Sequence, residues 1–165
     1  MSLIEPLLSE LERESATTRR VFERVPADKF GWKPHPKAKS LGQLAAHIAL
    51  VPRAISEILK NDVHEMAPPP TPELQSREQL LALFDESLAA AKQNLAAFSD
   101  DQMNATWSLV IGGKTIFAMP RAAVVRTIIL NHLYHHRGQL TTYLRFLDVP
   151  VPAVFGPSAD ENPFM

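Results

Sequence analysis

The chain has 165 residues, which suits one domain spanning residues 1–165, and it carries 17 Lys and Arg against 18 Asp and Glu for a formal charge of −1. This balance gives no general attraction to polyanions, so nucleic acid is not an expected partner. The chain has no cysteine, which excludes disulfides, thiolate metal ligands and a cysteine nucleophile.

The beginning of the chain carries no signal for export or membrane insertion. Residues 1–6 (MSLIEP) lack a basic segment followed by an apolar one. Elsewhere no uncharged apolar run approaches the roughly 18 residues of a membrane span. We therefore expect a cytoplasmic protein without a membrane partner.

The first predicted helix covers residues 2–25, because apolar side chains recur there at steps of three and four with charges between them. Pro26 ends it. A second helix begins after Ser40, whose hydroxyl can form a capping box with the glutamine three residues later. Its apolar stripe continues to Leu59, so Pro52 should bend this helix rather than end it.

A long proline-rich linker separates the second helix from the third. Within it, residues 68–72 (PPPTP) should form an extended connector. The third helix begins after Ser76, which has a second capping signature with Gln79, and ends near Phe98.

Two β-prone runs in residues 106–117 flank a Gly-Gly pair, which suits a two-residue hairpin turn. In that register Trp107, Leu109 and Ile116 lie on one face. The segment therefore predicts a small β-hairpin flap, whose tryptophan can roof a cavity.

Pro120 fits the first turn of a fourth helix that reaches about Leu147. After it, residues 149–165 should form an extended tail that packs on the bundle or contacts a second subunit. The elements together predict an all-α protein, a four-helix bundle with a long linker between the second and third helices. The inward stripe of the fourth helix comprises Val125, Ile129, His132, His136, Leu140 and Tyr143.

Two histidines, His132 and His136, interrupt this otherwise apolar row. Positions four apart share a helix face about 6 Å apart at Cβ, so both rings can bind one metal ion. Both can equally be neutral core side chains that each donate one hydrogen bond. His135 is a rival ligand at a spacing of three from His132, although the apolar stripe favours His136.

His47 lies beside the apolar stripe of the second helix and should face inward. A single buried histidine is more often a hydrogen-bonded core residue than a ligand. Three imidazoles together are more specific, because they leave a coordination position open, as catalytic zinc sites do. Nickel, cobalt, manganese and iron also suit such ligands.

Arg137, directly after His136, has two interpretations. It can recognise a carboxylate or reach Asp160 and Glu161 in the tail, or it can be a solvated cation on the helix surface.

Short motifs are spread along the chain, and as a set they resemble the DinB family. They are residues 24–26 (RVP), 32–36 (WKPHP), 40–49 (SLGQLAAHIA), 132–140 (HLYHHRGQL), 143–145 (YLR), 149–152 (VPVP) and 156–161 (GPSADE). The resemblance covers nearly the whole chain. Two positions depart from it, since Phe155 stands where the tail often has tyrosine and Asp148 where glycine is common.

The resemblance implies a four-helix bundle, usually a homodimer, in which three histidines hold a divalent metal ion, commonly nickel or zinc. The matching positions here are His47, His132 and His136. Relatives with assigned reactions are metal-dependent transferases or isomerases that use a low-molecular-weight thiol such as bacillithiol, mycothiol or glutathione. The lack of cysteine in this chain agrees with an external thiol.

Three hypotheses for function follow. The first is a metal-dependent S-transferase, or an enzyme of related reaction, that takes a thiol and a small-molecule substrate. The second is a metal-dependent hydrolase, although no Glu or Asp follows the histidine motif as it does in HExxH enzymes. The third is a non-catalytic, stress-related dimer in which the metal serves stability or sensing.

Overall fold

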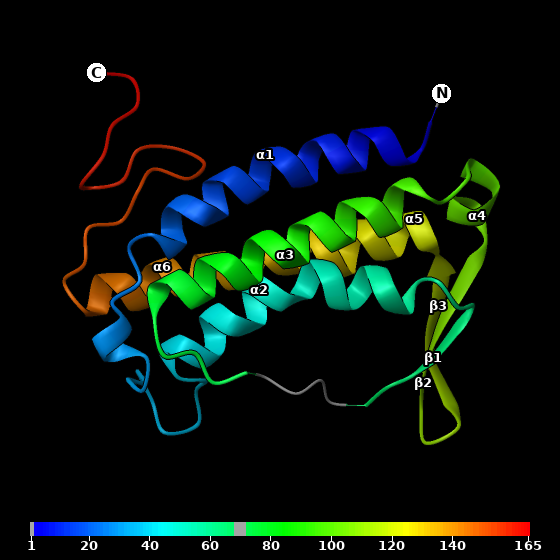
Figure 1. Ribbon diagram of the computed structural model, residues 1–165, viewed down its shortest axis with the longest axis horizontal. Helices are drawn as coiled ribbons and strands as arrows, with labels where there is room; N and C mark the ends of the chain where they lie inside the picture. The colour runs from blue at the N-terminus through cyan, green and yellow to red at the C-terminus, as the bar shows by residue number, and fades with distance from the viewer. Residues whose placement is uncertain (1, 68–71) are drawn as a thin grey trace.

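The computed structural model describes residues 2–67 and 72–165. Within this part, four long helices lie side by side and a small sheet closes one end of the bundle (Figure 1). The helices are α1 (Ile4–Phe22), α2 (Leu41–Ile58), α3 (Arg77–Ala96) and a composite last helix made of α5 (Arg121–Val124), the π-helical segment η2 (Val125–Asn131) and α6 (His132–Phe146). The predicted helical bundle is confirmed.

Serine caps fix where two of these helices begin. Ser40 Oγ accepts from the amide of Gln43, and Gln43 Oε1 accepts from the amide of Ser40, which completes the predicted capping box of α2. At α3, Ser76 Oγ accepts from the amide of Gln79, while the Gln79 side chain accepts from the amide of Gln75. Each cap satisfies amides that the first helical turn leaves unpaired.

Helix α2 continues through Pro52, as predicted. A proline offers no amide hydrogen to the helix, so the ladder is weakened at this point. On the facing helix α3, Ser87 Oγ accepts from the amide of Arg53 at 3.1 Å, and Asn94 Nδ2 donates to Ser56 Oγ at 3.1 Å. These two bonds join α2 to α3 beside the proline.

The long linker lets α2 and α3 point in the same direction (Figure 1). The chain leaves α2 at the sheet end, adds strand β1 (Val63–Glu65), and returns to the opposite end before α3 begins. The predicted extended connector covers residues 68–72, and all of it except Pro72 lies outside the described residues. Helix α1 then packs against α3 and α6, and α2 packs against α3 and α6, so the four helices form a ring around the core.

The sheet has three strands in the order β1, β2 (Thr106–Ile111) and β3 (Lys114–Pro120). The predicted hairpin is confirmed, and both residues of its turn have positive φ, 57° at Gly112 and 75° at Gly113, which glycine adopts without strain. Strand β1, which pairs in parallel with β2, was not predicted. A short helix, α4 (Asp100–Asn104), links α3 to the sheet.

The prediction for Ile116 was wrong. A bulge between Leu109 and Val110 shifts the register by one residue, so that Leu109 faces Phe117 instead of Ile116. Trp107 and Leu109 are buried as predicted, whereas Ile116 points outward and is 55% exposed. A shift of one residue moves side chains to the other face of a strand.

Two clusters of buried apolar side chains fill the bundle. One lies at the sheet end and includes Leu59, Trp107 and Ile129, and the other lies at the opposite end and includes Ile48 and Leu133. The last helix passes from the first cluster to the second between residues 129 and 133, which is where its π-helical segment ends.

The tail after α6 is tied to the bundle by charged groups. Asp160 pairs with Arg145 and accepts from the amide of Val151 at 2.8 Å, while Glu161 pairs with Arg20 of α1. These contacts hold the tail against one subunit. In the described ranges, no helix is long and apolar enough to cross a membrane.

Candidate metal centre

Three histidines meet where α2 packs against the last helix. His47 lies two turns into α2, and His132 and His136 lie one turn apart at the start of α6. All three side chains are half-buried, and they sit where the two apolar clusters adjoin. Their inner edges are therefore shielded from water while one side stays open.

The rings converge on one point. Nε2 of His47 and Nε2 of His132 are 3.3 Å apart, and one nitrogen from each of the three rings lies within 4.8 Å of the others. Bonds of about 2.0–2.1 Å to a tetrahedral zinc ion place two ligand nitrogens roughly 3.3 Å apart. The separation of His47 from His132 thus fits two imidazoles that share an ion, and it also permits a hydrogen bond between one neutral ring and the other.

The three imidazoles are held neutral, which is the form that binds metals. Burial, followed by the neighbouring His136 and His132, lowers the pKa of His47 to about 4. Burial is also the main reason that the pKa values of His132 and His136 are lowered. At neutral pH, protons therefore compete weakly with a metal ion for these nitrogens.

Contacts from outside the cluster orient two of the rings. Gln139 Oε1 lies 2.7 Å from Nδ1 of His136, so a proton on Nδ1 is bonded there and Nε2 keeps its lone pair. The ring of His132 has a hydrogen bond to the backbone of Ile128 in the π-helical segment, which partly opposes the fall of its pKa. Segments with π-helical turns occur often at functional sites.

The rival ligand His135 and the histidine of strand β1 lie outside the cluster. His135, the rival ligand, is exposed, and its ring centroid is 4.8 Å from that of His136. His64 is on β1, where its ring stacks on Trp107. The geometry therefore brings together the set His47, His132 and His136 and leaves out His135.

Neither interpretation of Arg137 is fully right. The side chain is 1% exposed, so it is not a solvated cation, and it does not pair with the tail carboxylates. It does recognise a carboxylate, that of the buried Glu14 on α1, at 2.9 Å. Its guanidinium also donates to the backbone of Glu14 and to Thr18 Oγ1, and it lies over the ring of Phe155.

The sequence also did not predict a second polar cluster between α1 and the last helix, which is centred on Glu10. Glu10 accepts two bonds from Arg126, at 2.6 and 2.7 Å, and one from the Tyr134 hydroxyl at 2.6 Å. These bonds, Arg126 first, lower the pKa of Glu10 to about 2, whereas burial and Glu10 raise the pKa of Tyr134. For Glu14 the sequence held a signal, because it falls on the apolar stripe of α1 between Leu11 and Thr18.

The family follows from a match over almost the entire sequence. The model of the DinB family matches residues 1–162. This chain belongs to the DinB family. A search of the curated proteins found no relative of it.

Solved structures of other DinB-like proteins share the fold. A DinB-like protein from Bacillus cereus is 22% identical with a TM-score of 0.72, and the match covers 92% of this chain and 97% of that one. YfiT from Bacillus subtilis, described as a probable metal-dependent hydrolase with an unusual four-helix bundle topology, is 13% identical with a TM-score of 0.67 over 88% of this chain and 87% of YfiT. The mycothiol-dependent maleylpyruvate isomerase is 15% identical with a TM-score of 0.58, over 92% of this chain and 65% of that one.

Proposed function

We propose that this DinB protein is an enzyme in which His47, His132 and His136 hold one divalent metal ion and a low-molecular-weight thiol acts as the nucleophile. The observation that carries the proposal is the convergence of three half-buried imidazoles, one nitrogen of each lying within 4.8 Å of the others. Three protein ligands are typical of catalytic sites, since a structural zinc has four.

The nature of the ion follows from the ligands and the family. Nickel or zinc is expected first, and manganese, iron or cobalt also binds imidazole. When bound, such an ion lowers the pKa of a thiol at its free position and so favours the nucleophilic thiolate.

The chain's own groups do the rest of the positioning. The histidines fix where the sulfur lies, and exposed Lys39, whose charge helps to lower the pKa of His47 and His136, adds positive potential at the open side. The thiol must come from outside, because the chain has no cysteine. In the reaction the thiol proton passes to solvent, the sulfur bonds to an electrophilic carbon, and the leaving group departs with its bonding electrons.

A hydrolase is the second candidate, favoured by the likeness to YfiT. It would need a base to take a proton from water. Among the described residues, the groups that shift the pKa values of the three histidines are each other, His135, Lys39, Gln139 and the backbone of Ile128, and no carboxylate is among them. A thiol has a lower pKa than water and needs less help from such a base.

The metal site is tested by elemental analysis of freshly purified protein. We expect about one divalent ion per chain. His132→Ala should lose most of it, because two imidazoles remain, and His135→Ala should keep it. Equal metal content in these two variants would remove His132 from the ligand set.

The reaction is tested on the same samples. Bacillithiol, mycothiol and glutathione are each mixed with the electrophile monochlorobimane, and metal-dependent conjugation is expected with at least one. Ester hydrolysis without any thiol would favour the hydrolase. A metal whose removal lowers the melting temperature, in protein that catalyses neither reaction, would favour the non-catalytic role. Light scattering of the same samples tests the expected homodimer.

A further inference from the structure

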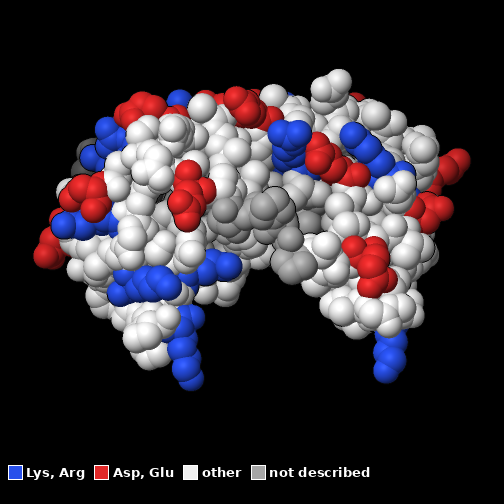
Figure 2. Space-filling model, turned by 60° about the horizontal axis from the view of Figure 1, so that its bottom comes forward, with Lys and Arg blue, Asp and Glu red and all other residues white. Residues whose placement is uncertain are grey.

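A second concave site lies at the sheet end of the bundle. It is a cavity of about 720 Å³, formed between the end of α2, the three strands and the start of the last helix. That volume falls within the range of roughly 300–1,000 Å³ found for small-molecule pockets. The face that carries the hairpin turn is also hollowed between two projections, each tipped by Lys or Arg (Figure 2).

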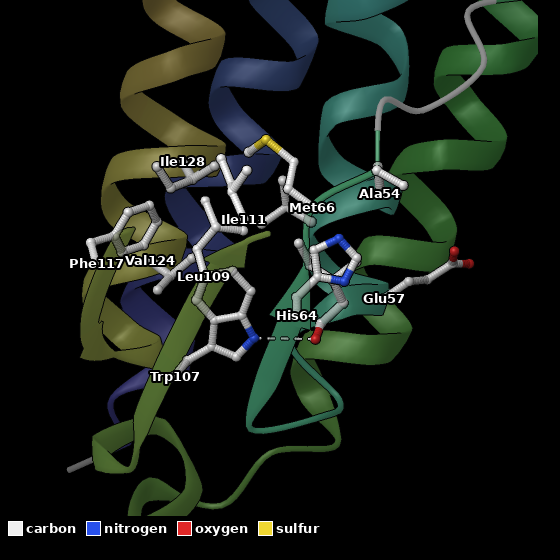
Figure 3. Close-up of a pocket in the computed structure, with 13 residues that line it drawn as sticks. Ala54, Glu57, His64, Met66, Trp107, Leu109, Ile111, Phe117, Val124 and Ile128 are labelled. Atoms are coloured by element: carbon white, nitrogen blue, oxygen red, sulfur yellow. Dashed lines mark hydrogen bonds between the residues drawn. The ribbon is translucent and has the colours of Figure 1, made fainter. Parts of the chain in front are cut away.

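The lining is almost wholly apolar. Figure 3 shows Trp107, Leu109, Phe117 and Ile128 directed into the same space. The indole nitrogen of Trp107 donates to the carbonyl of Ile58 at 3.2 Å, so its one polar atom is already bonded and its ring faces the cavity.

Two titratable side chains, those of Glu57 and His64, lie in the lining of the cavity. The carboxylate of Glu57 points away from the apolar side chains in Figure 3 and pairs with Arg53 one turn earlier. The His64 ring lies stacked against Trp107. At the mouth, Met66 and Ile111 are 48% and 43% exposed, so the apolar lining of the cavity continues to the surface.

The cavity and the histidine cluster lie along the same two helices, although none of the three histidines lines the cavity. Ile128 precedes His132 by one turn, and Ile55, eight residues after His47, is about 12 Å further along α2 at about 1.5 Å per residue. An acceptor that fills the cavity would have to extend past Ile128 by about one helical turn for its other end to reach the histidines, which a substituted naphthalene or a medium-length acyl chain is long enough to do.

We propose that this cavity binds the apolar, uncharged portion of the acceptor substrate, so that the electrophilic carbon at its other end lies at the histidine cluster. The choice of substrate class rests on the proposed function. Binding in the cavity depends only on the lining, because burying an unpaired charge there would be costly while apolar surface gains free energy on leaving water.

Two probes that differ by one charged group test the lining. N-phenyl-1-naphthylamine is uncharged, and 1-anilinonaphthalene-8-sulfonate has the same rings plus a sulfonate. In a Trp32→Phe background Trp107 is the one remaining tryptophan of two. We expect the uncharged probe to quench its emission at one molecule per chain and to bind at least tenfold more tightly than the sulfonate.

A pair of matched variants locates the binding. Ala54 lines the cavity and Ala90 is a half-buried residue of α3 outside it. Ala54→Phe should weaken binding of the uncharged probe at least tenfold, and Ala90→Phe should leave it unchanged. Equal binding by both variants, or no quenching of Trp107, would overturn the proposal. So would a dimer that Ala54→Phe dissociates while the probe fails to bind, because that would assign this face to self-association.

A further variant tests binding in the cavity independently of the metal-dependent reaction. His132→Ala should bind the uncharged probe as the wild type does, so the cavity can be confirmed even if no metal or conjugation is found. If conjugation is found, Ala54→Phe should raise KM at least tenfold for a chloromethyl-naphthalene and leave KM for the small electrophile iodoacetamide unchanged. An equal rise for both would show that the cavity does not receive the acceptor.

Discussion

The last helix directs polar side chains toward both α1 and α2. On α1 they find hydrogen-bond and ion-pair partners, whereas on α2 they meet another imidazole. Toward α1, the Arg137 guanidinium meets the carboxylate and backbone of Glu14 and the hydroxyl of Thr18. Toward α2, His132 and His136 meet another imidazole, that of His47. The first group is closed to solvent and the second is half open.

This difference separates a polar group whose bonds are all made within the chain from a cluster that could hold an ion. A buried charge whose bonds are all made within the chain adds specificity to packing and leaves nothing to bind. The three histidines bring one nitrogen each to within 4.8 Å of the others, and a hydrogen bond between His47 and His132 can use only two of these nitrogens. An external cation is what this geometry can accommodate.

The largest expected effect on stability comes from removing the contact between Arg137 and Glu14 of α1. Arg137→Met keeps the apolar length of the side chain and leaves the buried Glu14 carboxylate with only the exposed Arg13, at 3.5 Å, which should lower the free energy of unfolding by about 3 kcal/mol. Urea denaturation of metal-free protein measures this. Metal content per folded chain should stay at the wild-type value, because the cluster toward α2 is untouched.

Two further variants control for loss of charge alone. Arg145→Met removes a cation from an exposed pair with Asp160 and should change stability little. Glu14→Leu combined with Arg137→Met should recover much of the loss, since no unpaired charge is then buried. If Arg137→Met were as stable as Arg145→Met, the Glu14 pair would have no part in holding the fold.

A smaller effect is expected on the α2 side. Gln139→Ala removes the acceptor at Nδ1 of His136, so the ring loses its fixed orientation and proton position. Loss of such a contact typically weakens metal binding about 10–100-fold. Competition between the protein and a chromophoric chelator for zinc measures the affinity.

Gln139→Glu is the matched variant, because a carboxylate can still accept the proton of Nδ1. It should bind zinc at least as tightly as the wild type. Gln139 is exposed, so neither change should alter the stability of the metal-free protein. Equal zinc affinity in Gln139→Ala and the wild type would show that Gln139 does not position the ring.

Local patterns were enough to predict much of this fold. Apolar periodicity and the serine caps gave the four helices, because these signals act within a few residues. The glycine pair predicted the hairpin turn for the same reason. The pairing of His132 with His136 was visible as a helical spacing, whereas the contact with His47 rested on two stripes that face each other.

The features that the sequence did not predict depend on contacts between residues far apart in the chain. Strand β1 has three residues and exists because β2 lies beside it. The bulge at Leu109 that turns Ile116 outward is set by packing on the bundle. The π-helical segment before His132 leaves the apolar stripe nearly unchanged, so periodicity could not predict it, and the partner of Arg137 lies 123 residues away.

The smallest expected effect concerns a second polar contact between the last helix and α1. It is the partly exposed group formed by Glu10, Arg126 and Tyr134. Arg126 and Tyr134 hold the pKa of Glu10 at about 2, below its ordinary 4.5. A lowered carboxyl pKa contributes stability that is complete above about pH 4.5 and is lost as the pH falls toward 2. Because solvent reaches this pair, Glu10→Gln should cost about 1 kcal/mol at pH 7, less than the shift alone implies.

The cost should then shrink on acidification, because protonation removes the same interaction from the wild type. Urea denaturation of Glu10→Gln and wild type between pH 7 and pH 2.5 should give curves that approach one another. Glu86→Gln, at an exposed position of α3, should run parallel to the wild type over the whole range. A constant gap for Glu10→Gln would mean that its carboxylate is not stabilised by ionic bonds to Arg126. The buried pair of Arg137 and Glu14 would then be the ionic contact through which the last helix stabilises its packing on α1.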